Sequence, residues 1–292
     1  MDPADPAPGP AADAKAAAMH ARRAASFGAV ATAYARHRPG YPDAALAWAA
    51  EPLAGPDRPC TVLDLGAGTG KLTLRLAGLR TGGPAGTVIA VEPDLQMLAE
   101  LTRQLDGQSR PSGRRAPAVR AVAGRAEAIA LADGSVDAVF AGQAAHWFDL
   151  DRALPEIARV LAPGGVLCFL WNAEDDRVAW VAGLHRASGR VNVAALSSFA
   201  ATEDTAIAAW LNGAGAGSFA PVETAVFAHA QPRTADSLID TMRTHSMFRV
   251  MDPPERETVL ARVRDYLAAT PETSGGEFSM PLCTIAMRAV RH

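Results

Sequence analysis

The sequence has little of what marks several large classes of protein. Three cysteines in 292 residues, Cys60, Cys168 and Cys283, lie far apart, so they indicate neither a disulfide framework nor a zinc site. No apolar run approaches the roughly 18 residues of a membrane span, and residues 1–20 lack the basic start and apolar core of a secretory signal. A net charge of −3 gives no electrostatic reason to expect nucleic acid as a partner. We therefore expect a cytoplasmic protein that binds neither nucleic acid nor a membrane.

What the sequence does have, from about residue 61 onward, is an alternation of short apolar runs and amphipathic segments. Thr87–Glu92 and Ser135–Phe140 are typical of buried strands, and Asp94–Leu105 and Asp151–Leu161 of helices. This pattern predicts an α/β fold with a seven-stranded, mostly parallel sheet and helices on both faces. Later elements are expected as a strand, two helices and a last strand: Val222–His229, Thr234–Ser246, Pro253–Ala269 and Phe278–Val290.

The chain divides by composition into five parts. Residues 1–20 are rich in Ala and Pro and read as a disordered tail. Residues 21–60 are expected to form an N-terminal helical cap, and 61–173 the ligand-binding core. Residues 174–217 read as a helical cap inserted after the fifth strand, and 218–292 as the C-terminal part of the sheet with its helices.

The most informative segment is 62–71, where an apolar strand leads into a glycine-rich turn and then a helix. Its glycines follow Asp64 in the pattern Asp-x-Gly-x-Gly-x-Gly. A dinucleotide fingerprint requires Gly-x-Gly-x-x-Gly, and a P-loop requires Gly-Lys-Ser/Thr, whereas Leu72 follows Lys71 here. The acidic residue before the first glycine fits a ligand with a cationic amine better than a pyrophosphate. Such a turn could also form without a ligand, but three glycines cost backbone entropy that a close ligand compensates.

Further polar residues follow the other strands. Glu92 lies 22 residues beyond Gly70, where a carboxylate can accept both hydroxyls of a ribose, although it could also be an exposed strand-end acid. Met97 fits either an adenine contact or the core. The segment Gln143–Asp149 follows the fourth strand, at the edge of an open α/β sheet where ligands bind.

The segment Asp64–Gly70 resembles the first motif of the class I methyltransferases that use S-adenosylmethionine. The run Gln-x-x-His-Trp-Phe at 143–148 narrows the resemblance to a small-molecule branch that includes the trans-aconitate methyltransferase-like enzymes. It is supported by Ser26–Gly28, by Tyr34-x-x-x-Arg38-Pro39-x-Tyr41-Pro42 and by Met242–Ser246. The resemblance spans about residues 22–290. It implies a Rossmann-like fold, S-adenosylmethionine as methyl donor and S-adenosylhomocysteine as product. The spacing of His and Glu residues suggests no metal site.

The resemblance also implies roles for individual residues. The expected cofactor-binding residues are Tyr34, Arg38, Asp64, Gly66, Ala67, Gly68, Gly70, Glu92, Pro93, Met97, Ala126, Glu127 and Gln143. The expected catalytic residues are His146, Tyr34 and Arg243. His146 suits acid/base work because its ordinary pKa lies near neutrality, and Arg243 could bind a carboxylate of the acceptor. Loop packing for His146, cap packing for Tyr34 and an exposed surface position for Arg243 are the structural alternatives.

The expected reaction is methyl transfer to an oxygen or electron-rich carbon of a small organic acceptor. The apolar acceptor contacts would come from four aromatic residues: Trp180, Phe199, Trp210 and Phe248. The absence of Asn/Asp-Pro-Pro-Tyr/Phe after the fourth strand argues against methylation of nucleic-acid or amide nitrogen. A composition rich in Ala, Arg and Gly hints at bacterial secondary metabolism. A non-catalytic protein that binds S-adenosylmethionine as a sensor, and an NAD-dependent oxidoreductase, which the glycine spacing disfavours, remain as alternatives.

Overall fold

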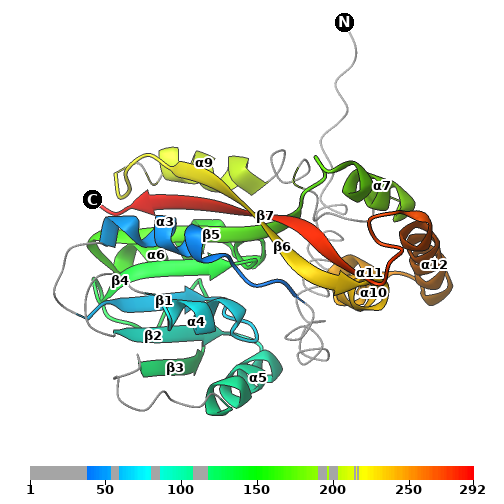
Figure 1. Ribbon diagram of the computed structural model, residues 1–292. Coiled ribbons are helices and arrows are strands. Elements are labelled where there is room, and N and C mark those ends of the chain that lie inside the picture. The colour runs from blue at the N-terminus through cyan, green and yellow to red at the C-terminus, as the bar shows by residue number, and fades with distance from the viewer. Residues whose placement is uncertain are drawn as a thin grey trace, which may run out of the picture.

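The computed structural model describes residues 38–53, 59–79, 86–107, 118–189, 196, 203–213, 215 and 217–292. They form a seven-stranded sheet in the order β3-β2-β1-β4-β5-β7-β6, with helices on both faces and a helical lobe beyond one edge (Figure 1). The strands are β1 (Thr61–Leu65), β2 (Thr87–Glu92), β3 (Ala118–Ala123), β4 (Val136–Gly142), β5 (Leu161–Glu174), β6 (Glu223–Thr234) and β7 (Glu277–Val290).

The first five strands pair in parallel, and β7 runs antiparallel between β5 and β6. The mostly parallel α/β sheet predicted from the sequence is therefore confirmed. Because β6 and β7 are antiparallel, β6 points the same way as β1–β5. The carboxyl ends of all these strands meet at one edge, which is where open α/β sheets bind ligands.

The helices that cover the sheet use apolar residues at helical spacing. α3 (Asp43–Ala50) and α4 (Lys71–Leu76) pack on one face, around Phe140, Cys168 and Leu170. α6 (Leu150–Val160) and α9 (Glu203–Asn212) pack on the other, around Phe169 and Trp171. α5 (Leu95–Asp106) follows β2 and is capped by the Asp94 carboxylate, which accepts from the backbone N–H groups of Gln96 and Met97. Two short 3₁₀ turns pack on opposite faces: η2 (Glu51–Leu53) on the face of α3, and η3 (Ala145–Trp147) on the face of α6.

The helical lobe has its own core. It consists of α7 (Ala179–Ala187), α10 (Ala235–Arg243), α11 (Ser246–Val250) and α12 (Pro253–Ala269), and lies beyond the carboxyl ends of β4 and β5 (Figure 1). The start of β7 contributes Phe278, Met280 and Leu282 to this core. The segment expected as one cap insertion thus divides between two layers, because α7 packs in the lobe while Ile207 and Leu211 of α9 pack against the sheet.

Three of the four aromatic residues expected to contact an acceptor have packing roles. Trp180 and Phe248 belong to the core of the lobe, and Trp210 packs against the core of the sheet. Phe199 lies outside the described residues, as do the predicted tail (1–20) and the first part of the predicted N-terminal cap (21–37).

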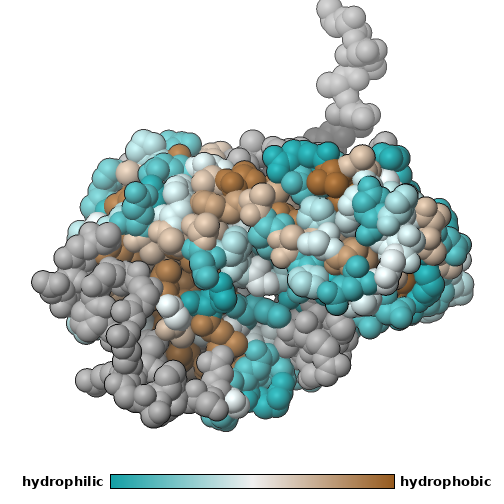
Figure 2. All heavy atoms as spheres, viewed as in Figure 1, coloured by the Kyte–Doolittle hydropathy of each residue, from teal (hydrophilic) through white to brown (hydrophobic). Residues whose placement is uncertain are grey.

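The surface is mixed in polarity. On the face shown in Figure 2, hydrophobic residues gather in separate groups between hydrophilic ones. The large hydrophobic side chains exposed among the described residues are Leu95, Val122 and Val226. In the part of the chain that the structure describes, no helix combines the length and the apolar character needed to cross a membrane.

Candidate functional site

The glycine-rich turn joins β1 to α4 at the carboxyl edge. Gly66, Gly68 and Gly70 all have positive φ, at 72°, 56° and 88°. A Cβ on Gly66 would lie 2.6 Å from the Cβ of Ala144, in the loop after β4, so this turn and that loop are tightly apposed. At Gly68 nothing lies within 4 Å of a Cβ position. Gly68 is thus the place in the turn where a ligand can approach the backbone.

Glu92, the last residue of β2, organises this turn. Its Oε2 accepts a 2.8 Å hydrogen bond from the Gly68 N–H, and its Oε1 accepts one of 2.9 Å from the Asp94 N–H. Burial raises the pKa of Glu92, while these two hydrogen bonds oppose the rise. Each carboxylate oxygen has a second lone-pair site, so both can also accept from a vicinal pair of hydroxyls.

Asp64 is the acid beneath the turn. Its Oδ2 accepts a 2.6 Å hydrogen bond from the Thr73 hydroxyl, and its Oδ1 is buried without a hydrogen-bond partner. Burial raises the pKa of Asp64 to about 7. The hydroxyl of Thr69, inside the turn, is also buried and unpaired. A buried carboxyl oxygen without a hydrogen-bond partner, beside a glycine turn that is open at Gly68, fits S-adenosylmethionine, a nucleoside with cationic groups. Asp64, Gly68 and Glu92 are the residues that would hold it.

The loop after β3 carries Ala126, which is buried, and Glu127. The Glu127 Oε1 accepts a 3.0 Å hydrogen bond from the Asp149 N–H, which ties this loop to the start of α6. Pro93 is exposed between β2 and α5, and Met97 is buried in the first turn of α5.

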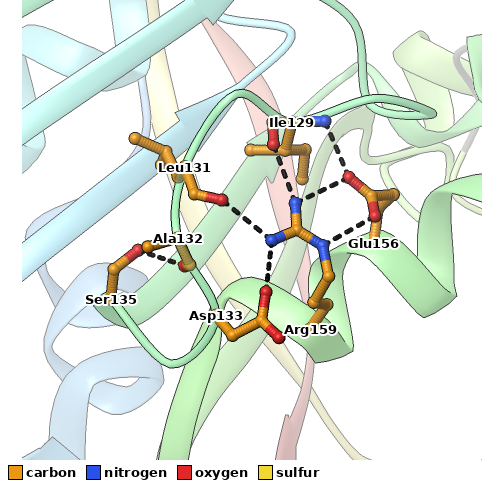
Figure 3. A network of polar contacts seen from close by, with 7 residues as sticks. All are labelled: Ile129, Leu131, Ala132, Asp133, Ser135, Glu156 and Arg159. Carbon is orange, nitrogen blue, oxygen red and sulfur yellow. Dashed lines mark hydrogen bonds and ion pairs between the residues drawn. The ribbon is translucent and has the colours of Figure 1, made fainter.

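An arginine on α6 fixes the same loop further on (Figure 3). The guanidinium of Arg159 donates to the carbonyls of Ile129 and Leu131, both at 2.8 Å, and to the carboxylates of Asp133 and Glu156. Glu156 in turn accepts from the Ile129 N–H at 2.9 Å. This network positions the loop that carries Ala126 and Glu127, which were predicted to bind the cofactor.

Gln143 follows β4 with a φ of 54°, the one positive φ outside glycine among the described residues. Its side-chain amide donates 2.8 Å to the Asn172 carbonyl at the end of β5, and its N–H donates 2.8 Å to the Leu170 carbonyl. Such strain is retained where the surroundings over-determine a residue, often at a functional site. His146, three residues on, is exposed, and its ring centre lies 4.7 Å from that of Trp147.

A group of basic side chains gathers at the same edge. The Arg38 Nε donates 3.2 Å to the hydroxyl of Thr244, the residue that ends α10. Burial, together with the charges of Arg38 and Arg233, lowers the pKa of His245 well below its ordinary value. Burial, together with the Arg233 charge, lowers the pKa of Lys71, which directly follows the glycine turn. We call Arg38, Lys71, Arg233 and His245 the basic cluster.

Sequence reasoning identified only Arg38 of this cluster. Arg233 lies near the end of β6, beyond the strand bounds predicted at Val222–His229, and is 6% exposed. His245 belongs to the segment Met242–Ser246, which was noted for its resemblance but given no role. The feature that marks Arg233 is the burial of a charged side chain at the carboxyl edge of the sheet. This burial depends on the pairing of β6 with β7, which the sequence does not reveal.

Acidic and neutral polar residues border the basic cluster. Glu174, which ends β5, lies with its Oε2 2.6 Å from the Nε2 of His185 on α7. Burial lowers the pKa of Arg233, and the charge of Glu174 opposes this change. Asn172 donates 2.9 Å to the Gly40 carbonyl. These contacts hold the chain around Arg38 against the ends of the strands.

The structure does not bring Arg243 to the other predicted site residues. It is exposed on α10 and forms ion pairs with Asp240 (3.4 Å) and Glu257 (3.2 Å), because its helix turns this position toward α12. Tyr34, the third predicted catalytic residue, lies outside the described residues. Within the described ranges, no group of three or more His, Cys, Asp or Glu side chains is arranged to hold a metal ion.

Comparison with known proteins gives a consistent result. Residues 63–169 match a family model described as a methyltransferase domain. An uncharacterized methyltransferase of Mycobacterium tuberculosis is 36% identical over 267 residues, covering 90% of this chain and 95% of the relative. An uncharacterized methyltransferase-like protein of Schizosaccharomyces pombe is 30% identical over 250 residues, covering 86% and 88%.

A solved structure shares the fold. The structure of a putative type II methyltransferase from Anaeromyxobacter dehalogenans has a TM-score of 0.57 and 24% identity to this chain. The match covers 87% of this chain and 97% of the other.

Proposed function

Because this chain belongs to the class I methyltransferases that use S-adenosylmethionine, we propose that it methylates an oxygen or electron-rich carbon of a small organic acceptor. The donor, when bound, supplies an already activated methyl group. The protein therefore needs no nucleophile of its own. It has to bind both molecules, exclude water and align the acceptor, and alignment alone is worth about 7 to 11 kcal/mol in well-oriented systems.

The observation that carries this proposal is the position of the basic cluster beside the glycine-rich turn of residues 66–70, which we call the donor turn. Lys71 begins α4 directly after Gly70, and it is close enough to Arg233 for the two charges to interact. Arg38 and His245 lie around the same guanidinium. Cationic groups held in a partly buried site stabilise an acceptor that is an anion or becomes one as the methyl group is accepted. Carboxylic acids, phenols and carbon acids have this property.

His146 is the proposed proton-handling residue at the mouth of the site. It lies on η3, three residues after the strained Gln143, and its ring is exposed. A base in this position adds typically two to four decades in rate. We propose that Arg38 and Arg233, in place of the expected Arg243, bind a carboxylate of the acceptor.

The acceptor is proposed to be a metabolite, not a nucleic acid or a membrane lipid. The net charge of −3 supports this choice, since backbone phosphates require a basic surface. A cytoplasmic enzyme of bacterial secondary metabolism is the proposed setting.

The test is a turnover assay with a panel of small phenols, carboxylic acids and carbon acids. We expect S-adenosylhomocysteine to accumulate with at least one acidic acceptor, and mass spectrometry to show a methylated product. Binding of S-adenosylmethionine with no turnover on any member would favour the sensor alternative. Tighter binding of NAD than of S-adenosylmethionine in parallel titrations would contradict the assignment of the donor.

A further inference from the structure

Three arginines meet at the junction of three lobe helices. Arg243 ends α10, Arg249 lies in α11, and Arg256 lies in the first turn of α12. α10 contacts both of the other helices, and the three lie together in the lobe (Figure 1). Among the described residues, these three side chains line a pocket of about 250 Å³, which we call the arginine pocket. It is distinct from the basic cluster, whose members do not line it.

The helices that carry the arginines are fixed by the core of the lobe. Met242 and Phe248, which directly precede two of the arginines in sequence, are buried in that core, and so is Val259, one turn after the third. Packing therefore sets the backbone position of each arginine. The guanidinium groups approach the pocket from points that do not move relative to one another.

The acids beside the arginine pocket hold its arginines only loosely. Arg243 lies 3.4 Å from the Asp240 carboxylate and 3.2 Å from Oε2 of Glu257, and Arg256 lies 3.5 Å from Oε1 of Glu257. A charge-assisted hydrogen bond between such groups is typically about 2.7 to 2.9 Å long. The ion pairs of Arg159 in this protein, at 2.7 and 2.8 Å, have that length. The arginines of the pocket thus keep much of their capacity to donate.

Arg249 is the least satisfied of the three. Its Nε is buried and has no hydrogen-bond partner. In the part of the chain that the structure describes, no carboxylate forms an ion pair with this side chain. A partly buried cation without a partner is costly, and polar groups of this kind in folded proteins often meet a bound ion or water. An anion in the arginine pocket would neutralise the Arg249 guanidinium.

The number of arginines favours a phosphate group as that anion. The Glu257 carboxylate has two oxygens, and it reaches only Arg243 and Arg256. A phosphate monoester carries a charge of about −1.5 to −2 and three strong acceptor oxygens, so it can accept from all three guanidinium groups.

The size of the pocket limits what it can enclose. Pockets that hold whole small ligands have volumes of about 300 to 1,000 Å³. At about 250 Å³, the arginine pocket suits the charged end of a ligand, with the remainder of the ligand outside.

We propose that the arginine pocket binds the phosphate group of a small phosphate monoester, and that Glu257 competes with this phosphate for Arg243 and Arg256. The Glu257 side chain is 57% exposed, so it can turn into solvent when a phosphate enters. The proposed site requires no methyl donor or acceptor, and its test is therefore independent of the proposed methyl transfer.

The test is calorimetric titration of the full-length protein with phenyl phosphate, at constant ionic strength because salt screens these charges. Phenyl sulfate, which has the same shape and a single charge, is the control ligand. We expect saturable binding of phenyl phosphate, and binding of phenyl sulfate that is weaker by about tenfold or more. Arg249→Gln and Arg256→Gln should each weaken the binding of phenyl phosphate by about tenfold or more, the loss expected for one charge-assisted hydrogen bond.

Two further variants separate the pocket from general charge effects. Arg264→Gln removes the same charge from α12 at an exposed position that pairs with Asp236 at 3.6 Å, and should leave the affinity unchanged. Glu257→Gln removes the competing carboxylate, and should tighten the binding of phenyl phosphate by about two- to fivefold.

Three results would overturn the inference. They are no saturable binding of phenyl phosphate by the wild-type protein, equal affinity for phenyl phosphate and phenyl sulfate, and unchanged affinity in both Arg249→Gln and Arg256→Gln. A loss of affinity in Arg233→Gln alone would assign the phosphate to the basic cluster and also contradict the inference. Thermal unfolding without ligand verifies that each variant is folded, and Arg256→Gln decides the matter if Arg249→Gln does not fold.

Discussion

The backbone N–H of Gly68 donates a 2.8 Å hydrogen bond to the Glu92 carboxylate, and this bond joins the two parts of the chain that would hold the methyl donor. One residue comes from the turn after β1 and the other from the end of β2, strands that pair in parallel from Thr61–Thr87 to Leu65–Val91. A ligand that approaches the open space at Gly68 would therefore also meet the remaining lone pairs of Glu92.

Replacing Glu92 with Gln tests this relationship. The Gln side chain has one oxygen and one NH₂ group, so it can accept from only one of the Gly68 and Asp94 N–H groups, and its NH₂ would face the other. The substitution also removes the negative charge to which ribose hydroxyls would donate. A charge-assisted hydrogen bond is worth about 1.5 to 3 kcal/mol, so we expect affinity for S-adenosylhomocysteine to fall by about 10- to 100-fold in calorimetric titration. Glu100→Gln removes a buried acid from α5, away from the strand ends, and serves as the matched control. An equal loss in both variants would refute the role of Glu92.

Asp64 makes the stability of the ligand-free protein depend on pH. Its pKa is raised from 3.8 to about 7, so between these values the folded state keeps a proton that the unfolded state has lost. The contribution of Asp64 to the free energy of unfolding therefore falls as pH rises across this interval, and stays at its lowest above it. Asp64→Asn keeps the contact with Thr73 and does not titrate. We expect its Tm relative to wild type to be higher at about pH 8 than at about pH 5. A Tm difference that does not change with pH would contradict the buried, protonated state.

The Arg159 network should be a stability element. Arg159→Ala would leave two loop carbonyls and the Glu156 carboxylate without their donor. We expect a clear fall in Tm, because these loop groups lose the donor that holds them to α6. Arg152→Ala, at an exposed position on the same helix, should change Tm little. A similar Tm in the two variants would show that the network is dispensable.

The same network gives an acid dependence of the opposite sign. Hydrogen bonding to Arg159 lowers the pKa of Glu156 to about 2, below its ordinary value of 4.5. The stabilisation is present above 4.5 and is lost as pH falls toward 2. The Tm difference between wild type and Arg159→Ala should therefore shrink as the solution is acidified below about pH 4.5.

His146→Ala addresses the exposed histidine. The ring lies on η3 and contacts Trp147, while the donor turn is held by Glu92 and by Val91, whose carbonyl accepts from the N–H groups of Gly66 and Ala67. We expect S-adenosylhomocysteine affinity to stay near normal and kcat to fall by about tenfold or more. A fall in affinity with unchanged kcat would remove His146 from the chemistry and give it a role in holding the donor.

Local patterns predicted much of the fold. The strand Thr87–Glu92 and the helix Pro253–Ala269 have the bounds expected from the sequence, since each is a strong local signal with clear ends. The donor turn is equally local, because Asp64, the glycines and Glu92 follow from strand ends and spacing. The division of 174–217 between lobe and sheet was not predictable, because it depends on which apolar faces meet in three dimensions.

The basic cluster depends on long-range pairing. β6 continues five residues beyond the predicted His229, because pairing with β7 extends to Thr234–Glu277, and this extension carries Arg233 to the site. Arg38 and Thr244 are separated by 206 residues and meet only in the folded chain. No sequence spacing connects such residues, so the basic cluster could be found only in the structure.

The most direct test of the account is methyl-label transfer by three proteins: wild type, Glu92→Gln and Arg233→Gln. Each is incubated with methyl-labelled S-adenosylmethionine and the acceptor panel, and labelled products are identified by mass spectrometry. The account predicts label in an acidic small molecule with wild type. It predicts recovery at higher donor concentration for Glu92→Gln, and at higher acceptor concentration for Arg233→Gln. No labelled product with wild type, or a product formed equally well by Arg233→Gln at low acceptor concentration, would contradict a single methyl-transfer site built from the donor turn and the basic cluster.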